Sequence, residues 1–553
     1  MPTPQPDLTI REFAGVDYYN DPRTLPLSKT NKAKNVYGGV NFVRKRPGTT
    51  PFPISWTGTN EPRDLHSMCE YKAVRNWEGV IPQEIGRHIL VLFFSRAHPL
   101  VYTDEWGYYD LRNGTFTDKG AISPGVSIPT GGYGVGAEAT TREFGVADDA
   151  GYVASTLAWV KLDTANLPEY TLASLPAWAA GMAHLAWFKG ILFAGPFAGS
   201  KVSFSLALHP EVQRSTDDEW ETDTSGSIKM LTGLKAVRDV LYQFSADQIE
   251  AITGTTFDQL DRVCIASGFG GCAQEGWADV YGTLVGFGTR RGTQAETDVI
   301  EAVAPDDILF ISGRTVKKIG LEIRPKLVTY PAAVDRRQRA TFWPGRDLAL
   351  LAPYVYYAGG PAAPSDNPGD TDVFAYDVKG GGFWPWSYGV DGSMVSMVTA
   401  PARVNGVDDM RVIFGMRRGP GSLLRYLDET AATDSGVPFE SFWETTWLDY
   451  GKQHEAKVEE IFIKGNQVSG GEVIISVATE RDDSTMKQVG TVDLEKGGGL
   501  IEGVSDIMAN LGMQVSSRWY KVRVDFAPDG VMQEINELTL TRKGQGRPKE
   551  WTS

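Results

Sequence analysis

The sequence predicts an all-β chain: a β-propeller preceded by an N-terminal arm and followed by a C-terminal antiparallel β-sandwich domain. Three observations support this prediction. Apolar and polar residues alternate at every second position in many segments, which is the pattern of half-buried strands. Gly is abundant, with 61 residues among 553, and Gly-containing turn signals separate the alternating segments. The 15 Trp, 21 Tyr and 24 Phe residues favour strands.

Residues 1–55 are expected to form a docking arm or a strand. The stretch "NKAKNVYGGVNFVRKRPGTTPF" at 31–52 has apolar residues for a strand and a Pro-Gly pair for a turn. Cations gather in this region although the formal net charge is −15: Lys29, Lys32, Lys34, Arg44, Lys45 and Arg46. We interpret them as a patch that docks onto an adjacent subunit or an acidic adaptor protein. A solvated face and a DNA contact are the alternatives.

Residues 56–430 are expected to form the propeller. Degenerate copies of one unit, a strand, a Gly turn and a second strand, recur at 88–111, 184–206, 231–254, 275–288, 307–320, 372–389 and 410–428. Spacings of roughly 40 to 55 residues are typical of four-stranded blades. A sandwich or barrel is the alternative, because no strict repeat identity is visible.

Two inserted loops are expected within the propeller, at 133–156 and 359–371. Helix is limited to a turn or two in "SADQIEAI" at 245–252 and "ETDVIEAV" at 296–303. After a linker at 428–438, about six strands between 439 and 543 predict a sandwich over 431–553 that ends in a short basic tail.

The sequence offers no catalytic, cofactor or metal site, so we predict that the protein is not an enzyme. Its 6 His residues lie far apart, without HxxxH or HExxH spacing. The glycines of "TGGYGVG" at 130–136 are not followed by a GKS or GKT triplet, and no GxSxG elbow is present. Cys69, Cys264 and Cys272 are too few for a disulfide framework or a zinc site; we expect free thiols at Cys264 and Cys272.

Two segments have both a functional and a structural interpretation. The acidic stretch "STDDEWETDTSG" at 215–226 has oxygen ligands for calcium but lacks the EF-hand register, so a solvated loop is favoured. In "FWPWSYG" at 383–389, Trp384 and Trp386 are either a sugar-stacking platform or the aromatic closing strand of a blade. We favour the strand, because large rings bury the most area there.

Charge and hydropathy narrow the class of protein further. The excess of 69 acidic over 54 basic residues argues against a protein whose main task is gripping nucleic acid. No apolar stretch approaches the roughly 20 residues that cross a bilayer. The start "MPTPQPDLTI" lacks the basic region and apolar core of a signal peptide. These features predict a protein made in the cytoplasm without a membrane span.

The order of several segments resembles a known family. These are "NVYGGVNFVRKRPGTTPF", "AWFKGILFAGPFAGSKVSFSLALHPE", "IKMLTGLKAVRDVLYQFSADQIEAITG", "GFGGCAQEGWADVYGTLVGFGTRRG", "DILFISGRTVKKIG" and "DVFAYDVKGGGFWPWSYG". Together they are similar to the tail hub or nozzle proteins of short-tailed bacteriophages, a group that includes tail tubular protein B and packaged DNA stabilisation proteins. The resemblance covers most of residues 31–390.

This resemblance implies a structural virion protein, made in the host cytoplasm and located in the tail. It implies an oligomeric ring, usually of six subunits, that extends the DNA channel, retains the packaged genome and conducts DNA during ejection. Implied partners are the portal and adaptor proteins of the head-to-tail connector, tail fibre or needle proteins, and genomic DNA that passes without specific binding. The alternatives are a host-surface glycan-binding or depolymerising tail component and a cellular β-propeller scaffold.

Overall fold

The computed structural model describes most of the chain, in two compact units. The described residues are 8–39, 41–52, 55–56, 62–75, 83–98, 101–110, 115–121, 127–129, 143–147, 150–154, 159–163, 171–173, 182–196, 201–206, 209–214, 220–221, 231–290, 303–330, 338–355, 372–388, 394–404, 407–416, 424–449, 456–480, 485–513 and 516–544. Unit 1 comprises Met1–Thr50, Val373–Gly389 and Leu427–Ser553. Unit 2 comprises Pro51–Asp372 and Val390–Tyr426.

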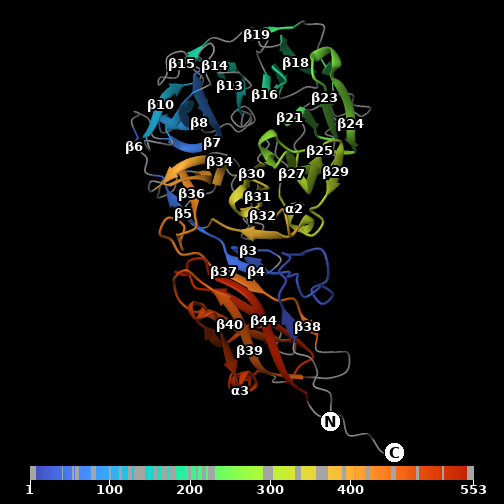
Figure 1. The fold of residues 1–553 in the computed structure, drawn as a ribbon, viewed down its shortest axis with the longest axis vertical. Helices are drawn as coiled ribbons and strands as arrows, with labels where there is room; N and C mark the ends of the chain where they lie inside the picture. The colour runs from blue at the N-terminus through green and yellow to red at the C-terminus, as the bar shows by residue number, and fades with distance from the viewer. Residues whose placement is uncertain are drawn as a thin grey trace, which may run out of the picture. The chain divides into compact units, whose positions relative to one another are not determined.

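Unit 2 is a β-propeller. Within its described residues, seven inner strands contact one another in sequence, and the last of them contacts the first, so that the ring closes. The contact between the fourth and fifth is made through the 3₁₀ turn η4 (Gln274–Gly276). The sheets fan outward from this ring (Figure 1). The inner strands are β7 (Pro62–Arg75), β12 (Glu143–Ala147), β16 (Met182–Phe188), β21 (Leu231–Val237), β26 (Trp277–Val280), β30 (Arg339–Trp343) and β34 (Met394–Val404).

The other strands of unit 2 complete the antiparallel sheets. They are β6 (Ser55–Trp56), β8 (Gln83–His98), β9 (Val101–Asp110), β10 (Thr115–Ala121), β11 (Ser127–Pro129), β13 (Ala150–Ala154), β14 (Trp159–Asp163), β15 (Thr171–Ala173), β17 (Ile191–Pro196), β18 (Lys201–Leu206), β19 (His209–Gln213), β20 (Trp220–Glu221), β22 (Val240–Ser245), β23 (Gln248–Thr253), β24 (Asp261–Ser267), β25 (Phe269–Gly271), β27 (Thr283–Arg290), β28 (Pro305–Ser312), β29 (Thr315–Lys318), β31 (Leu348–Ala352) and β35 (Val407–Met416). β6 and β10 pair in parallel, and every other strand pair with a described register is antiparallel.

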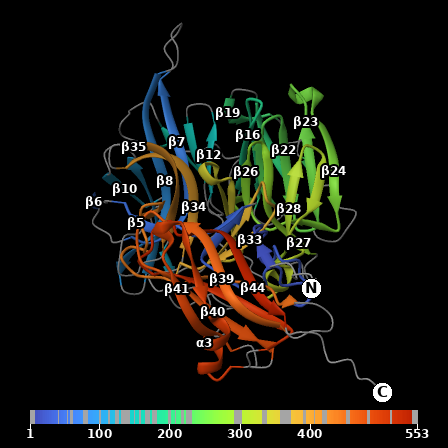
Figure 2. The same ribbon diagram turned by 60° about the horizontal axis from the view of Figure 1, so that its bottom comes forward.

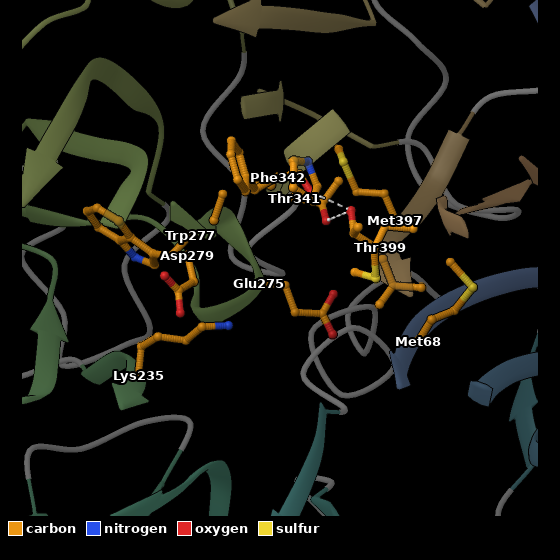
Figure 3. Close-up of a pocket in the computed structure, with 14 residues that line it drawn as sticks. Met68, Lys235, Glu275, Trp277, Asp279, Thr341, Phe342, Met397 and Thr399 are labelled. Atoms are coloured by element: carbon orange, nitrogen blue, oxygen red, sulfur yellow. Dashed lines mark hydrogen bonds between the residues drawn. The ribbon is translucent and has the colours of Figure 1, made fainter. Parts of the chain in front are cut away.

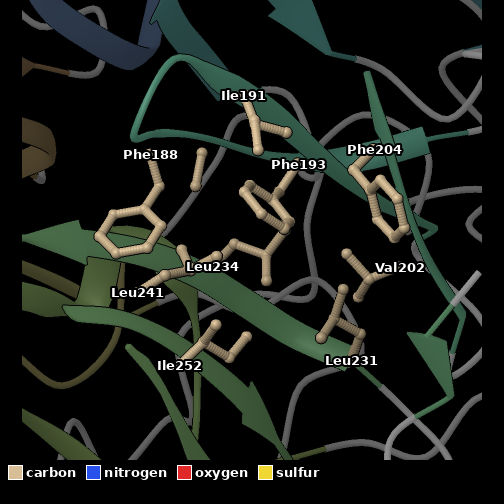
Figure 4. Close-up of a cluster of buried hydrophobic side chains, with 10 residues drawn as sticks. Phe188, Ile191, Phe193, Val202, Phe204, Leu231, Leu234, Leu241 and Ile252 are labelled. Carbon is tan, nitrogen blue, oxygen red and sulfur yellow. The ribbon is translucent and has the colours of Figure 1, made fainter. Parts of the chain in front are cut away.

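The sheet of β21 to β24 shows how alternation builds a blade, because its two faces pack against different neighbours. On one face, Leu241 and Ile252 join Phe193 and Phe204 of the preceding sheet in a buried cluster (Figure 4). On the other face, Phe244 stacks on Trp277 of the following sheet, with ring centroids 4.4 Å apart. Burial on both faces stabilises this blade through its two neighbours.

Three expectations about unit 2 are wrong. Residues 143–147 and 150–154, within the expected loop at 133–156, pair as the hairpin of β12 and β13. The segments 275–288 and 307–320 belong to one sheet, through pairing of β27 with β28, and are not two blades. The expected helical turn at 245–252 is a bend followed by β23, which pairs with β22 and β24. The loop at 359–371 and residues 296–302 lie outside the described residues.

The propeller is closed by chain segments from opposite ends of its sequence. Phe52 follows β5 (Gly48–Pro51), and its backbone N–H donates to the carbonyl of Leu424 in β36 (Leu424–Asp428) at 3.0 Å. The Phe52 and Tyr426 rings are 4.9 Å apart. Pairing of the two ends ties the last sheet to the start of the unit.

Unit 1 consists of two antiparallel sheets and a hairpin. One sheet has the order β3-β4-β44-β39-β42, with β1 also paired to β44, and the other has the order β2-β37-β43-β40-β41, with β38 also paired to β43. Figure 2 shows β39 and β44 running side by side. The strands are β1 (Leu8–Ile10), β2 (Ala33–Lys34), β3 (Val36–Gly39), β4 (Phe42–Lys45), β32 (Val373–Asp377), β33 (Phe383–Trp386), β37 (Ser441–Glu444), β38 (Leu448–Asp449), β39 (Ala456–Asn466), β40 (Val473–Thr479), β41 (Lys487–Val492), β42 (Gly498–Glu502), β43 (Trp519–Phe526) and β44 (Glu534–Gly544).

The N-terminal segment is integral to unit 1 and is not a separate arm. Leu8 to Ile10 pair with Leu540 to Leu538, and Val43 pairs with Ile535, so N-terminal strands extend the C-terminal sheet. Ala33 pairs with Trp443 in the other sheet. The alternation predicted for "KVRVDF" is present, since Val522 and Val524 are buried. The predicted C-terminal sandwich therefore exists, but the start of the chain supplies some of its strands.

Helix is scarce in the described part of the chain. The α-helices are α2 (Arg324–Leu327) and α3 (Val504–Asn510), and the 3₁₀ turns besides η4 are η3 (Phe257–Gln259), η5 (Pro344–Arg346) and η8 (Leu494–Lys496). None of the helices described has the length and apolar character needed to cross a membrane.

Candidate functional site

The predicted docking patch lies in what we call the basic segment, residues 29–46, which runs through β2, β3 and β4 of unit 1. Because side chains alternate along a strand, neighbouring cations in this segment point in different directions. The structure therefore distributes the six predicted residues among distinct environments instead of bringing them together on one surface.

Arg46 is the most deeply buried of the six, with 1% of its surface exposed. Its guanidinium forms an ion pair with Asp434, in which one hydrogen bond is 3.0 Å long. Further N–H groups donate to the side-chain oxygen of Asn35 at 3.1 Å and to the carbonyl of Ser387 at 2.6 Å. The guanidinium also lies 3.8 Å from the ring centroid of Phe439. Arg46 thus links three separate stretches of unit 1.

Lys45 is also buried, with 2% of its surface exposed. Its Nζ lies within hydrogen-bond distance, 2.8 to 3.1 Å, of four backbone carbonyl oxygens, those of Ala432, Ala527, Pro528 and Gly530. These carbonyls belong to two segments of the C-terminal part of the chain. A single ammonium group therefore joins β4 to both segments.

The other four cations lie nearer the surface. Arg44 pairs with Glu534 of β44, and its Nε lies 2.6 Å from the carboxylate. Lys34 pairs with Glu440 at 3.3 Å, and the exposed Lys32 with Glu444 at 3.8 Å. Lys29 is half-buried in a turn, where its backbone N–H donates to the carbonyl of Pro26.

The six cations are therefore not a single exposed docking patch. Lys45 and Arg46 are buried, and Arg44, Lys34 and Lys32 pair with acidic residues near the other end of the sequence. Sequence reasoning missed those acidic partners: Asp434, Glu440, Glu444 and Glu534. The only available signal was the opposite charge, because nothing in the local pattern selects a partner some 388 residues away.

The burial of Lys45 predicts a pH-dependent stability. Burial and the charge of Arg46 lower the pKa of Lys45 to about 8, against an opposing effect of Asp529 and Asp434. The ordinary lysine value is 10.5. Between these pH values the unfolded chain binds a proton that the folded chain has released, so the contribution of Lys45 to stability rises with pH. It is fully present above pH 10.5 and is lost as the pH falls through 8.

Urea unfolding of the native protein and of Lys45→Met at pH 7, 8, 9 and 10 measures this contribution. The native free energy of unfolding minus that of the variant is expected to be flat up to about pH 8 and to increase above it. A difference that stays constant or falls between pH 8 and pH 10 would contradict the assigned direction.

Other sequence candidates do not form a reaction centre in the part of the chain that is described. There, no three His, Cys, Asp or Glu residues are placed to hold a metal ion. Cys264 and Cys272 are free thiols, as expected, and burial raises the pKa of Cys272. Most of the acidic stretch at 215–226 lies outside the described residues.

Trp384 and Trp386 lie in β33, and 1% and 0% of their surfaces are exposed. The Trp386 indole N–H donates to the carbonyl of Val36 at 2.7 Å. A Cβ added to Gly38 would lie 2.5 Å from the Trp384 ring, so this ring packs directly on the β3 backbone. The predicted closing-strand interpretation is confirmed in that both rings are buried in a strand. A sugar-stacking platform would require exposed ring faces.

Comparisons with known proteins identify no family. No family model matches the chain. No curated protein matches it either. Among solved structures, it is similar to the N-terminal domain of Nup159, with 12% identity, a TM-score of 0.33, and coverage of 71% of this chain and 97% of that one. BamB from Moraxella catarrhalis shows 9% identity, a TM-score of 0.32, and coverage of 76% and 95%. An exo-β-1,3-galactanase from Phanerochaete chrysosporium, in complex with galactose, shows 8% identity, a TM-score of 0.25, and coverage of 89% and 100%. At TM-scores this low, the similarities carry no conclusion about this chain.

Proposed function

We propose that this protein is a structural component of a bacteriophage tail, a hub or nozzle subunit that assembles into a ring around the DNA channel. In this role it contacts the portal and adaptor proteins above it and fibre or needle proteins beyond it. The genome passes through without specific binding. The segment order over most of residues 31–390, which resembles that of short-tailed phage nozzle proteins, supports this proposal.

One observation carries the proposal: cations of the densest basic cluster in the sequence form ion pairs and hydrogen bonds with other residues of unit 1. Arg46 and Lys45 are buried, and Arg44 is ion-paired to Glu534. A chain of net charge −15 therefore lacks the local basic surface that its N-terminal sequence suggests. An acidic channel repels the DNA backbone, and a polyanion slides through such a channel without adhering.

The rival interpretations have less support. A glycan-binding tail component would use exposed aromatic platforms, and the aromatic pair that the sequence offers is buried. A cellular propeller scaffold accounts for the fold equally well. It predicts no assembly with a portal complex, and that difference separates the two proposals.

The charge argument predicts weak DNA binding. In fluorescence anisotropy with a labelled duplex at about 150 mM salt, we expect no binding tighter than roughly 100 μM, the weak end of the non-specific range. We expect this because the negative net charge of the protein repels the DNA backbone. The cations of the basic segment are buried or paired with acidic residues of the same chain. Micromolar binding that weakens steeply with added salt would contradict a non-adhering conduit.

A further inference from the structure

A cavity of about 370 Å³ opens among the inner strands of the propeller. Residues of five consecutive positions in the ring line it: β21, η4 with β26, β30, β34 and β7. The cavity therefore lies at the centre of unit 2, and its size is in the range of small-molecule sites. Nothing in the proposed tail function requires it, so the inference below is independent of that function.

One wall of the cavity is apolar and adaptable. Met68, Met397 and Phe342 are each 7% to 8% exposed and come from three different inner strands (Figure 3). Met410, which is 39% exposed, adds a third thioether to the lining. Thioether side chains are flexible and polarisable, so such a wall accommodates apolar groups of various shapes.

Two hydroxyl groups among the described lining residues, those of Thr341 and Thr399, already form hydrogen bonds. Thr399 donates to the carbonyl of Phe342 at 2.7 Å, and the Thr341 and Thr399 hydroxyls lie 2.8 Å apart. They fix β34 against β30. Among the described lining residues, the charged side chains are therefore the groups that can recognise a charged ligand.

Of the three charged side chains among the described residues that line the cavity, one forms an ion pair. Glu275 lies 2.6 Å from Arg339, whose side chain is only 4% exposed. The other two, Lys235 on β21 and Asp279 on β26, have no ion-pair partner among the described residues. One Asp279 oxygen, Oδ1, accepts the backbone N–H of Gly282 at 2.7 Å, and its other oxygen accepts no hydrogen bond from the residues that the structure describes.

Lys235 and Asp279 lie on the same side of the cavity in Figure 3, and they do not pair with each other. The Lys235 ammonium and the Asp279 carboxylate both line the cavity, and each is available to a charged group of a ligand. A ligand with one carboxylate and one ammonium group offers each of them a charge-assisted hydrogen bond.

We propose that this cavity binds a small zwitterion with an apolar side chain, the chemical class of the apolar α-amino acids. The ligand carboxylate pairs with the Lys235 ammonium, the ligand ammonium pairs with Asp279, and the apolar side chain packs on the thioether wall. Lys235 is half-buried and Asp279 is exposed at the mouth of the cavity, so each charged end of the ligand pairs with a side chain that it can reach from solvent.

Ligand chemistry tests this assignment on the full-length protein. Isothermal titration calorimetry with L-leucine is expected to show binding, and L-leucinamide and 4-methylpentanoate, which each lack one charged group, are expected to bind at least about tenfold more weakly. Absence of leucine binding up to about 10 mM would overturn the proposal. Equal affinity for all three compounds would overturn it as well.

Matched variants assign the two contacts. Lys235→Met is expected to lower the affinity for leucine at least about tenfold and to remove the preference for leucine over leucinamide. Asp279→Asn, which keeps the acceptor for Gly282, is expected to remove the preference for leucine over 4-methylpentanoate. Lys317→Met, at an exposed lysine of β29, is the control and should bind like the native chain. Leucine binding unchanged in both cavity variants would refute the site.

Discussion

Arg46→Met is expected to lower the free energy of unfolding by about 3 to 5 kcal/mol, because it leaves the Asp434 carboxylate buried without its partner. It also removes the hydrogen bonds that Arg46 donates to the Asn35 side-chain oxygen and to the Ser387 carbonyl. Urea unfolding followed by tryptophan fluorescence measures the loss in the transition of unit 1. This is the largest effect expected of any single change in the basic segment.

Two further variants distinguish the loss of the buried ion pair from the effect of an Arg→Met substitution in general. Arg23→Met removes an exposed ion pair with Glu480 and should change stability by no more than about 0.5 kcal/mol. The double variant Arg46→Met, Asp434→Asn should be more stable than Arg46→Met, because the unpaired buried charge is gone. If Arg46→Met is as stable as the native chain, the buried contacts of Arg46 do not stabilise unit 1. The interpretation of the basic segment as a docking patch would then be favoured again.

Trp386→Ala is expected to cost about 3 to 5 kcal/mol, the range for removing a large buried ring. Trp386 is fully buried, its N–H donates to Val36, and its ring makes an edge contact with Tyr37, with centroids 6.0 Å apart. The same urea unfolding experiment measures the loss. Trp386→Phe keeps a ring but loses the donor, so we expect a smaller cost of about 1 to 2 kcal/mol.

Tyr19→Ala is the matched control for this prediction, since Tyr19 also lies in unit 1 but is 57% exposed. It should leave stability within about 0.5 kcal/mol of the native value. A surface platform predicts the reverse pattern: Trp386→Ala would keep full stability and lose glycan binding on an array.

The sequence predicts the propeller strands because their alternation is a local signal. Tyr242 and Phe244 point to one neighbouring sheet and Leu241 to the other, and this can be read from six consecutive residues. The hairpin of β12 and β13 was missed because "EFGVA" and "AGYVA" are short and rich in Gly and Ala, without a clear apolar face. "DQIEAI" resembles a helical turn by composition. It forms most of β23 instead, because it pairs with β22 across the sheet.

The candidate site was predictable only as a cluster of cations. What those cations contact is decided by pairings across most of the chain, such as Arg44 with Glu534 at a separation of 490 residues. No local pattern encodes such a pair. The cavity residues were equally hidden, because Lys235, Asp279 and Met397 come from separate strands that meet only when the ring closes.

Negative-stain electron microscopy of the purified protein, alone and mixed with a portal–adaptor complex, tests the central proposal most directly. The proposal predicts rings, usually of six subunits, that seat coaxially on the adaptor end of the complex and extend its channel. Monomers that remain unattached in the presence of the portal complex would contradict the assignment as a tail hub or nozzle.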